Sequence, residues 1–113
     1  MNQTYSFIED ENGVMERLCG NEALFKRLLT KFRDTYSASR TKLIFLLDAG
    51  DKEESYRLVH SIKGVSANLG IGKLYRLSIA LENRMKAHEY SNIQTETEAF
   101  LVELETVITE ISN

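Results

Sequence analysis

His60 lies in a segment with helical spacing, and its imidazole is predicted to point away from the buried side of that helix. The apolar residues of segment 51–69 recur at intervals of four, three and four, at Leu58, Ile62, Val65 and Leu69. This spacing predicts one face packed against a core, and at about 100° per residue His60 falls about 170° from the middle of that face. At neutral pH most of a free imidazole is uncharged and offers a nitrogen lone pair, so an exposed His60 could act as a nucleophile without a separate base.

The neighbours of His60 on the outward side favour a chemical role over a merely solvated side chain. Lys63 and Ala67 lie within about 60° of His60, and Gly64 lies about 40° to its other side. Lys63 could bring a positive charge to a reacting group, and Gly64 and Ala67 leave space beside it. A glycine inside a helix costs about 1 kcal/mol relative to alanine. Because the packed face lies on the other side, we expect that a partner needs the space at Gly64.

The run from His60 to Gly70 reads HSIKGVSANLG. It resembles the signature of histidine-containing phosphotransfer (HPt) domains, H-x-[IL]-K-G-x-[SA]-x-x-[IL]-G, at every specified position. Segment 20–32, with Gly20-Asn21-Glu22, Leu28, Leu29 and Phe32, resembles the second helix of that family, and Leu77 with Ala80-Leu81-Glu82 resembles the helix after the histidine. The resemblance covers roughly residues 13–108 and is to the relay modules of multi-step two-component signalling.

The resemblance implies phosphoryl transfer through His60. The receiver domain of a response regulator would present an aspartyl phosphate, a nitrogen of His60 would take the phosphoryl group, and the aspartate of a second receiver would later accept it. Such a transfer is catalysed mainly by positioning and charge stabilisation, and Lys63 is expected to supply part of the charge. The resemblance places the metal ion and the other catalytic groups on the receiver, so we expect no cofactor and no metal site in this chain.

Four residues on or near the outward face are expected to contact the partner, namely Gly64, Ala67, Asn68 and Arg40. The turn between the long helix and the histidine helix would bring Arg40 beside His60, at the rim of the contact. For Asn68, a hydrogen bond that orients the helix is an equal alternative.

Two other function classes remain open. The first is the phosphoacceptor domain of a chemotaxis-type kinase, which an ATP-binding domain phosphorylates and whose motif also resembles His-Ser-Ile-Lys-Gly. The continuation Ser-Ala-Asn-Leu over residues 66–69 favours the relay type. The second is an adaptor bundle that binds receivers without phosphotransfer, and the intact His60 and Lys63 argue against it.

Spacing excludes further catalytic classes. A metal-binding bundle needs Glu-x-x-His pairs, but Arg57 lies three residues before His60, and Met85 three before His88. His88 is expected near a helix end, where its charge is favourable, and is not expected to be phosphorylated. Segment 70–73, Gly-Ile-Gly-Lys, lacks the spacing of nucleotide-binding loops. The chain is therefore not a kinase by itself, and it either stands alone or is covalently linked to a sensor histidine kinase.

The composition is that of a folded domain, since 42% of the 113 residues are apolar and 27% are charged. No apolar stretch is long enough to span a bilayer, and a net charge of −3 without a basic run argues against a nucleic-acid partner. A single cysteine, Cys19, cannot form an internal disulfide, and the N-terminus lacks the order of a secretory signal. We expect a cytoplasmic monomer without direct membrane contact, or the cytoplasmic part of a membrane-anchored sensor kinase.

The absence of proline and the spacing of apolar residues predict helices throughout. We expect a short helix over residues 8–18, a long helix over 21–50 with a kink at 37–39, the histidine helix, and two helices over 74–85 and 93–111. Capping boxes are predicted at 51–54 and 91–94, and a turn at Gly70 and Gly72. Short connections between long amphipathic helices require antiparallel neighbours. The prediction is an all-α fold, an antiparallel up-and-down four-helix bundle with a short additional N-terminal helix, in one HPt domain over residues 1–113 with residues 1–6 loose.

Overall fold

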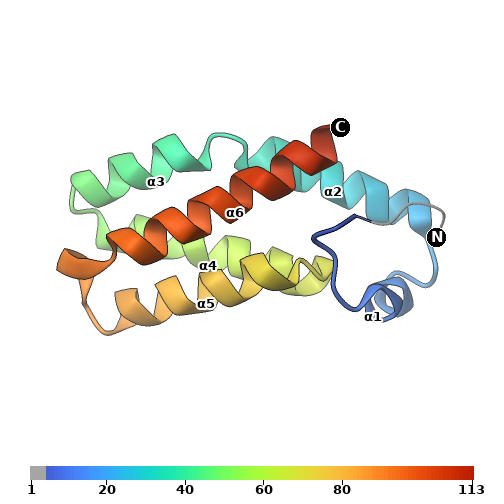
Figure 1. The fold of residues 1–113 in the computed structure, drawn as a ribbon, viewed down its shortest axis with the longest axis horizontal. Helices are drawn as coiled ribbons and strands as arrows, with labels where there is room; N and C mark the ends of the chain where they lie inside the picture. The colour runs from blue at the N-terminus through green and yellow to red at the C-terminus, as the bar shows by residue number, and fades with distance from the viewer. Residues whose placement is uncertain (1–4) are drawn as a thin grey trace.

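The computed structural model describes residues 5–113, and all regular secondary structure in that part of the chain is helical (Figure 1). The helices are α1 (Glu11–Arg17), α2 (Glu22–Tyr36), α3 (Ser39–Asp48), α4 (Lys52–Leu69), α5 (Gly72–Lys86), the 3-10 helix η1 (Tyr90–Asn92) and α6 (Gln94–Ser112). Ile8 and Ile71 form an isolated antiparallel bridge. No helix in this part of the chain is long and apolar enough to cross a membrane. The predicted all-α class is confirmed.

The helices form an elongated bundle with extents of 44 × 24 × 20 Å. The histidine helix α4 packs against α5, α3 and α2, whereas α6 packs against α5 and α2. In Figure 1, α2 and α3 follow one another along one side, and α1 lies below the first turns of α2, beyond the ends at which α4 and α5 join. The helices packed next to the site residues of α4 are therefore α5 on one side and α2 with α3 on the other.

Apolar residues spaced three and four apart build the core, because such residues share one face of a helix. The largest fully buried side chains are Phe25, Phe32, Phe100, Leu29, Leu43, Ile62, Ile71, Leu74, Leu81, Met85, Leu101 and Leu104. In α4 the predicted stripe is only slightly displaced, since Val65 is partly exposed while Val59 and Ser66 are buried. The opposite face of α4 is consequently free, as the spacing predicts.

The predicted long helix is two helices. α2 ends at Tyr36 and α3 begins at Ser39, because Ala38 leaves helical geometry at φ −100° and ψ 14°. Ser37 and Ser39 flank this residue, and serine is a poorer helix former than alanine because its hydroxyl competes for backbone hydrogen bonds. The kink predicted at residues 37–39 is therefore a complete break.

Of the two hydrogen bonds that a capping box predicts at the start of α4, one forms. The Asp51 side chain accepts from the Glu54 backbone N–H at 3.1 Å, as an N-cap residue should. The Asp51 backbone N–H donates to Leu46 O at 2.9 Å, so the reciprocal bond of a capping box does not form. The Glu54 carboxylate instead pairs with Arg57 at 2.6 Å. One cap is enough to fix where the histidine helix begins.

Two predicted helix boundaries are corrected. The capping box predicted at residues 91–94 is wrong, because residues 91 and 92 belong to η1 and α6 begins after Ile93 without a side-chain cap. Ile93 is buried, so packing decides this boundary. Gly72, predicted to be in a turn, is the first residue of α5, whereas Gly70 adopts the left-handed conformation that ends α4 (φ 72°).

The first helix is shorter than the predicted segment 8–18. Asp10, at φ 57°, precedes α1 and its side chain accepts from Gly13 N at 3.2 Å. Just before it, Glu9 N donates to Gly70 O at 2.6 Å, and the Glu9 carboxylate pairs with Arg76 of α5 at 2.8 Å. Residues 8 and 9 are thus held by backbone and side-chain contacts against the end of α4 and the start of α5, and are not available to form helix.

Residues 1–6 are expected to be loose, and residues 1–4 of this segment lie outside the described residues. Within the described part, Ser6 N donates to Glu110 Oε2 at 2.6 Å, and Phe7 is buried. The described N-terminal segment is therefore tied to α6 and to the core.

We predict that Gly70→Ala destabilises the protein more than Gly50→Ala. Both glycines have a left-handed backbone, with φ 72° and 71°, so alanine at either position costs about 1–2 kcal/mol of strain. A Cβ at Gly50 would meet no atom within 4 Å, whereas one at Gly70 would lie 2.6 Å from Glu9 O and 2.7 Å from Val14 Cγ2. Urea unfolding should give the lower free energy of unfolding for Gly70→Ala. Equal losses would show that the segment before α1 is not held against Gly70.

Candidate functional site

His60 projects from the free face of α4, and 57% of its side chain is exposed. Buried residues on the other face of the helix, among them Leu58 and Ile62, fix its rotation. The Tyr56 ring stacks on the imidazole one turn away, with centroids 5.7 Å apart and an angle of 14° between the planes. The outward orientation predicted from the spacing is confirmed.

Glu82 of α5 holds the other side of the imidazole. Its Oε2 lies 2.7 Å from His60 Nδ1, and its Oε1 lies 2.7 Å from Lys63 Nζ and 3.1 Å from Lys86 Nζ. Only 2% of the Glu82 side chain is exposed. These four residues, called here the Glu82 network, join α4 to α5 at the level of His60.

Three donors keep the buried Glu82 carboxylate ionised. Burial raises the pKa of this carboxyl, but the hydrogen bonds from Lys63, His60 and Lys86 lower it by more, so that its pKa is about 2. A carboxylate is otherwise almost never found buried, because its desolvation is costly. At neutral pH Glu82 is therefore a fixed negative charge under the imidazole.

The hydrogen bond to Glu82 also decides which imidazole nitrogen is free. An ionised carboxylate only accepts hydrogen bonds, so Nδ1 must carry the proton and donate to Glu82. In the neutral ring Nε2 then holds the lone pair. No residue among 5–113 is hydrogen-bonded to Nε2. The arrangement therefore presents Nε2 of His60 as an accessible nucleophile.

Sequence reasoning missed the roles of Glu82 and Lys86. A signal was present, since Glu82 follows the buried Ser78 by four positions and precedes the buried Met85 by three. A carboxylate on the buried side of a helix needs partners. Lys63 is not the free cation that the helical wheel suggested, because its side chain is only 23% exposed and its ammonium group is paired with Glu82.

Gly64 lies beside His60 on the free face, and an ideal Cβ built there would meet no atom within 4 Å. No packing contact in the described chain therefore demands a glycine. Ala67 and Asn68 are also exposed, and their backbone carbonyls accept hydrogen bonds from Arg17 of α1, at 3.4 and 2.9 Å. The Asn68 side chain makes no hydrogen bond within residues 5–113, so the helix-orienting bond considered for it is not seen. The free face of α4 thus continues from His60 to Asn68.

Arg40 and His88 are not part of the Glu82 network. The Arg40 guanidinium bonds to Glu98 and Glu105 of α6, at distances from 2.8 to 3.1 Å, whereas His60 and Lys63 bond to α5. The structure therefore does not bring Arg40 together with His60, and its role as a rim contact stays a prediction. His88 follows the end of α5 at φ 59° and is exposed. Nothing like the Glu82 network surrounds it.

Within the part of the chain that the structure describes, no group of three or more His, Cys, Asp and Glu side chains could hold a metal ion. The chemistry available to this site is that of one oriented imidazole, an ionised carboxylate and two ammonium groups.

Comparison with known proteins gives one match. The family model described as "Hpt domain" matches residues 27–113, a span that contains α3 to α6, most of α2 and all of the Glu82 network. Neither the curated proteins nor the solved structures include a match to this chain. The resemblance inferred from the motif at His60 is thereby confirmed.

We predict that Glu82→Gln lowers stability at neutral pH and that the difference from the wild type shrinks in acid. The folded-state pKa of Glu82 is about 2, below the ordinary value of 4.5. The ionised carboxylate therefore stabilises the fold above pH 4.5, and this contribution is lost as the pH falls toward 2. Glutamine would leave the ammonium group of Lys63, whose side chain is only 23% exposed, without a counter-charge. Chemical denaturation at a series of pH values measures the difference.

Glu53→Gln is the matched control, because Glu53 is 80% exposed and its pair with Arg57 lies at the surface. Such a pair contributes little to stability, so this variant should follow the wild type closely. A loss in Glu82→Gln that is the same at every pH would show that the charge of the carboxylate does not stabilise the fold.

Proposed function

The chain belongs to the Hpt domain family, whose members carry out histidine phosphotransfer in two-component signalling, and we propose that it is a phosphorelay intermediate. In this proposal His60 accepts a phosphoryl group from the aspartyl phosphate of one response-regulator receiver domain and passes it to the aspartate of another. The observation that carries the proposal is the orientation of His60, with Nδ1 bonded to Glu82 and Nε2 accessible.

The phosphoryl transfer can be written with the residues at hand. Nε2 of His60 forms a bond to phosphorus while the bond from phosphorus to the aspartyl oxygen breaks, and the electron pair stays on the receiver's carboxylate. The imidazole then carries a positive charge, and its Nδ1–H still donates to Glu82. The negative charge of Glu82 stabilises this developing cation, much as a buried carboxylate supports a catalytic histidine. Transfer to the second receiver breaks the bond from Nε2 to phosphorus and restores the neutral ring.

Lys63 and Lys86 make the net charge around Glu82 positive. Two ammonium groups oppose one carboxylate, so Lys63, Lys86 and Glu82 together place a net positive charge next to the imidazole. An incoming phosphoryl group carries negative charge on its oxygens, which a nearby positive field favours. We assign Lys63 both to this charge and to holding Glu82. The metal ion and the remaining catalytic groups are expected on the receiver.

The proposal also covers the topology of the domain, its contacts with the receiver and its place in the cell. We infer an antiparallel up-and-down four-helix bundle in which α2 and α3 together form one of the four legs. Gly64, Ala67 and Asn68 would contact the receiver on the free face of α4, with Arg40 at the rim. The domain would act as a cytoplasmic monomer, alone or covalently linked to a sensor histidine kinase.

We predict that His60 is the phosphorylation site. Purified receiver domains, each carrying labelled aspartyl phosphate, are mixed with the wild type, His60→Gln and His88→Gln. Label should appear on the wild type and on His88→Gln but not on His60→Gln, because His88 lacks the Glu82 network. The label should survive alkali and be lost in acid, as expected for a phosphoramidate. Label on His60→Gln would refute the assignment.

The same experiment separates the alternative functions. Labelling by a purified ATP-binding kinase domain, without transfer from any receiver, would identify a chemotaxis-type phosphoacceptor domain. A stable complex with a receiver and no label on the wild type would identify a non-transferring adaptor.

We predict that Gly64→Ala raises stability while it slows transfer, and that Gly64→Gln slows transfer further. Alanine in an exposed helix interior removes a backbone-entropy cost and should stabilise the protein by up to about 1 kcal/mol. The added atoms occupy the space beside His60, and a misplacement of about 1 Å can slow a reaction on the order of a hundred-fold. Thermal unfolding and transfer kinetics measure the two effects. Ala99→Gln, exposed on α6, is the control for added bulk and should transfer like the wild type; Gly64 variants that also do so would contradict the prediction.

A further inference from the structure

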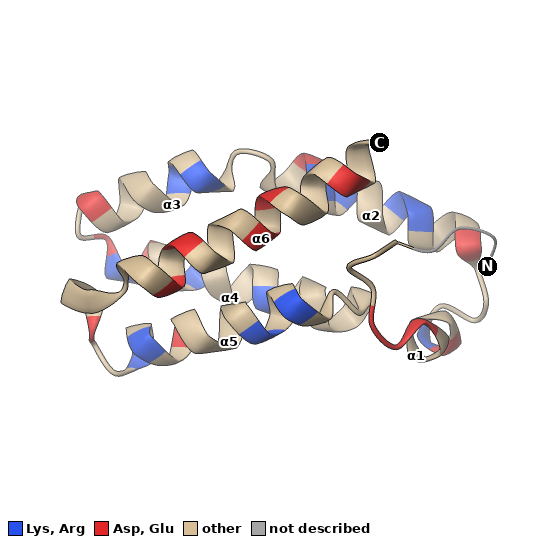
Figure 2. Ribbon diagram, in the orientation of Figure 1, with Lys and Arg blue, Asp and Glu red and all other residues tan. Residues whose placement is uncertain are grey.

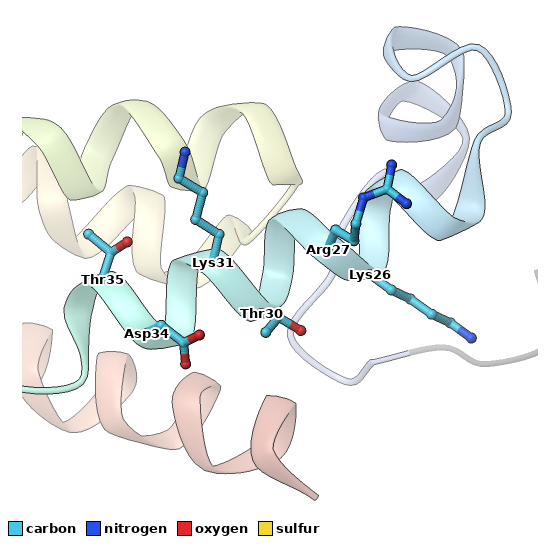
Figure 3. A pocket seen from close by; sticks show the side chains of 6 residues that line it. All are labelled: Lys26, Arg27, Thr30, Lys31, Asp34 and Thr35. Atoms are coloured by element: carbon cyan, nitrogen blue, oxygen red, sulfur yellow. The ribbon is translucent and has the colours of Figure 1, made fainter.

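The exposed side of α2 carries three cations that have no ion-pair partner within residues 5–113. Lys26, Arg27 and Lys31 line a shallow hollow along this helix, together with Thr30, Asp34 and Thr35 (Figure 3). The single carboxylate there, Asp34, is paired with Arg33 at 3.0 Å. These three side chains are called here the α2 basic surface.

Most other basic residues of the described chain are paired. Seven of them have a side-chain nitrogen within 4 Å of a carboxylate oxygen, namely Arg40, Arg57, Arg76, Arg84, Lys63, Lys73 and Lys86. The α2 basic surface therefore forms no ion pair within residues 5–113. Its three cations are free to meet charge on another molecule.

Charge is divided unevenly between two helices that pack against each other, α2 and α6. α6 holds five acidic residues and no basic one, whereas α2 holds four basic residues and two acidic ones. Figure 2 shows this contrast between the two ribbons. Because the whole chain has a net charge of −3, the positive charge on α2 runs against the sign of the molecule. An acidic partner would be attracted to α2 and repelled by α6.

The α2 basic surface flanks the helix that carries His60. α2 packs beside α4, and the Tyr36 hydroxyl of α2 lies 2.5 Å from the hydroxyl of Ser61, the residue after His60. In Figure 3, Lys31 projects on the side of α4, whereas Asp34 lies on the side of α6. On the other flank of α4, Lys86 of α5 adds a further positive charge. An acidic surface that approaches His60 would meet cations on both sides.

We propose that Lys26, Arg27 and Lys31 form an electrostatic docking surface for an acidic face of the receiver domain that exchanges phosphate with His60. This inference rests on the proposed function. It assigns to α2 the capture and orientation of the partner, and leaves the transfer itself to the Glu82 network.

The size of the surface favours a protein over a lipid or nucleic-acid partner. Recognition of anionic lipids typically needs clusters of about four to eight lysines and arginines, and nucleic-acid binding needs an extended basic stripe. Three cations with a single carboxylate, that of Asp34, beside them fit a protein face in which acidic and neutral groups alternate. Charges at the rim of a protein interface mainly raise the association rate, and salt screens the effect.

The test compares two variants with the same net charge. One combines Lys26→Gln, Arg27→Gln and Lys31→Gln, and the control combines Gln94→Glu, Thr95→Glu and Ala99→Glu on α6. Each set changes the net charge from −3 to −6, and all six side chains are exposed. Circular dichroism and thermal unfolding confirm that both fold. The probe is the phosphorylated receiver domain that transfers fastest to the wild type.

At about 0.05 M ionic strength the α2 variant should show about ten-fold lower kcat/KM for transfer than the wild type, because electrostatic steering acts on the encounter. The gap should close to within about two-fold at about 0.5 M, where screening is strong. The α6 control should remain much closer to the wild type at low salt. Equal effects of the two sets would show that only net charge matters and would overturn the docking surface.

The failures of the two proposals are distinguishable. If no receiver transfers phosphate to the wild type, the proposed function fails. If a receiver transfers to the wild type and to the α2 variant alike at low salt, only the docking surface fails. Cosedimentation with phosphatidylserine vesicles that is lost in the α2 variant, with transfer unchanged, would assign the surface to lipid and overturn the inference.

Discussion

A single buried carboxylate governs the geometry of the candidate site. Glu82 reaches from α5 to α4 and bonds to both His60 and Lys63 at 2.7 Å. Such a group can be buried only when donors offset its desolvation, and here three donors do so. The same bonds that make the burial tolerable also fix the imidazole plane, its tautomer and the position of the ammonium group. The burial of Glu82 and the orientation of the imidazole therefore depend on one set of hydrogen bonds, so a change at these residues would affect both.

The helix that carries His60 is held firmly at both ends while its outer face stays open. Asp51 caps its first turn, and Arg17 of α1 donates to the carbonyl of Asn68 in its last turn. Between these ends, Gly64 leaves space beside the imidazole. The imidazole of His60 thus lies on an exposed helix face. An open face on a rigid helix suits a protein that must exchange a phosphoryl group with a second protein, because the partner can bring its own catalytic groups to the histidine.

The distribution of charge extends this arrangement beyond the reacting atoms. Cations surround Glu82 and line α2, whereas α6 is acidic and packs against α5 and α2, away from the free face of α4. Long-range electrostatics and short-range hydrogen bonding would then have separate tasks. In the proposed function, long-range electrostatics would orient an acidic partner, and the hydrogen bonds of Glu82 would orient the imidazole of His60 for reaction.

The sequence by itself determined the helical class, the outward direction of His60 and the empty space at Gly64, because each follows from local spacing along one helix. It did not determine the break at Ala38, the start of α6 after Ile93 or the partners of Lys63, since these depend on residues distant in the chain. The role of Glu82 shows the difference most clearly. Its position on the buried side of α5 could be read from the sequence, but only the packing of α5 against α4 decided that His60, Lys63 and Lys86 would surround it. A helical wheel shows which way a side chain points, and the tertiary structure decides what it meets.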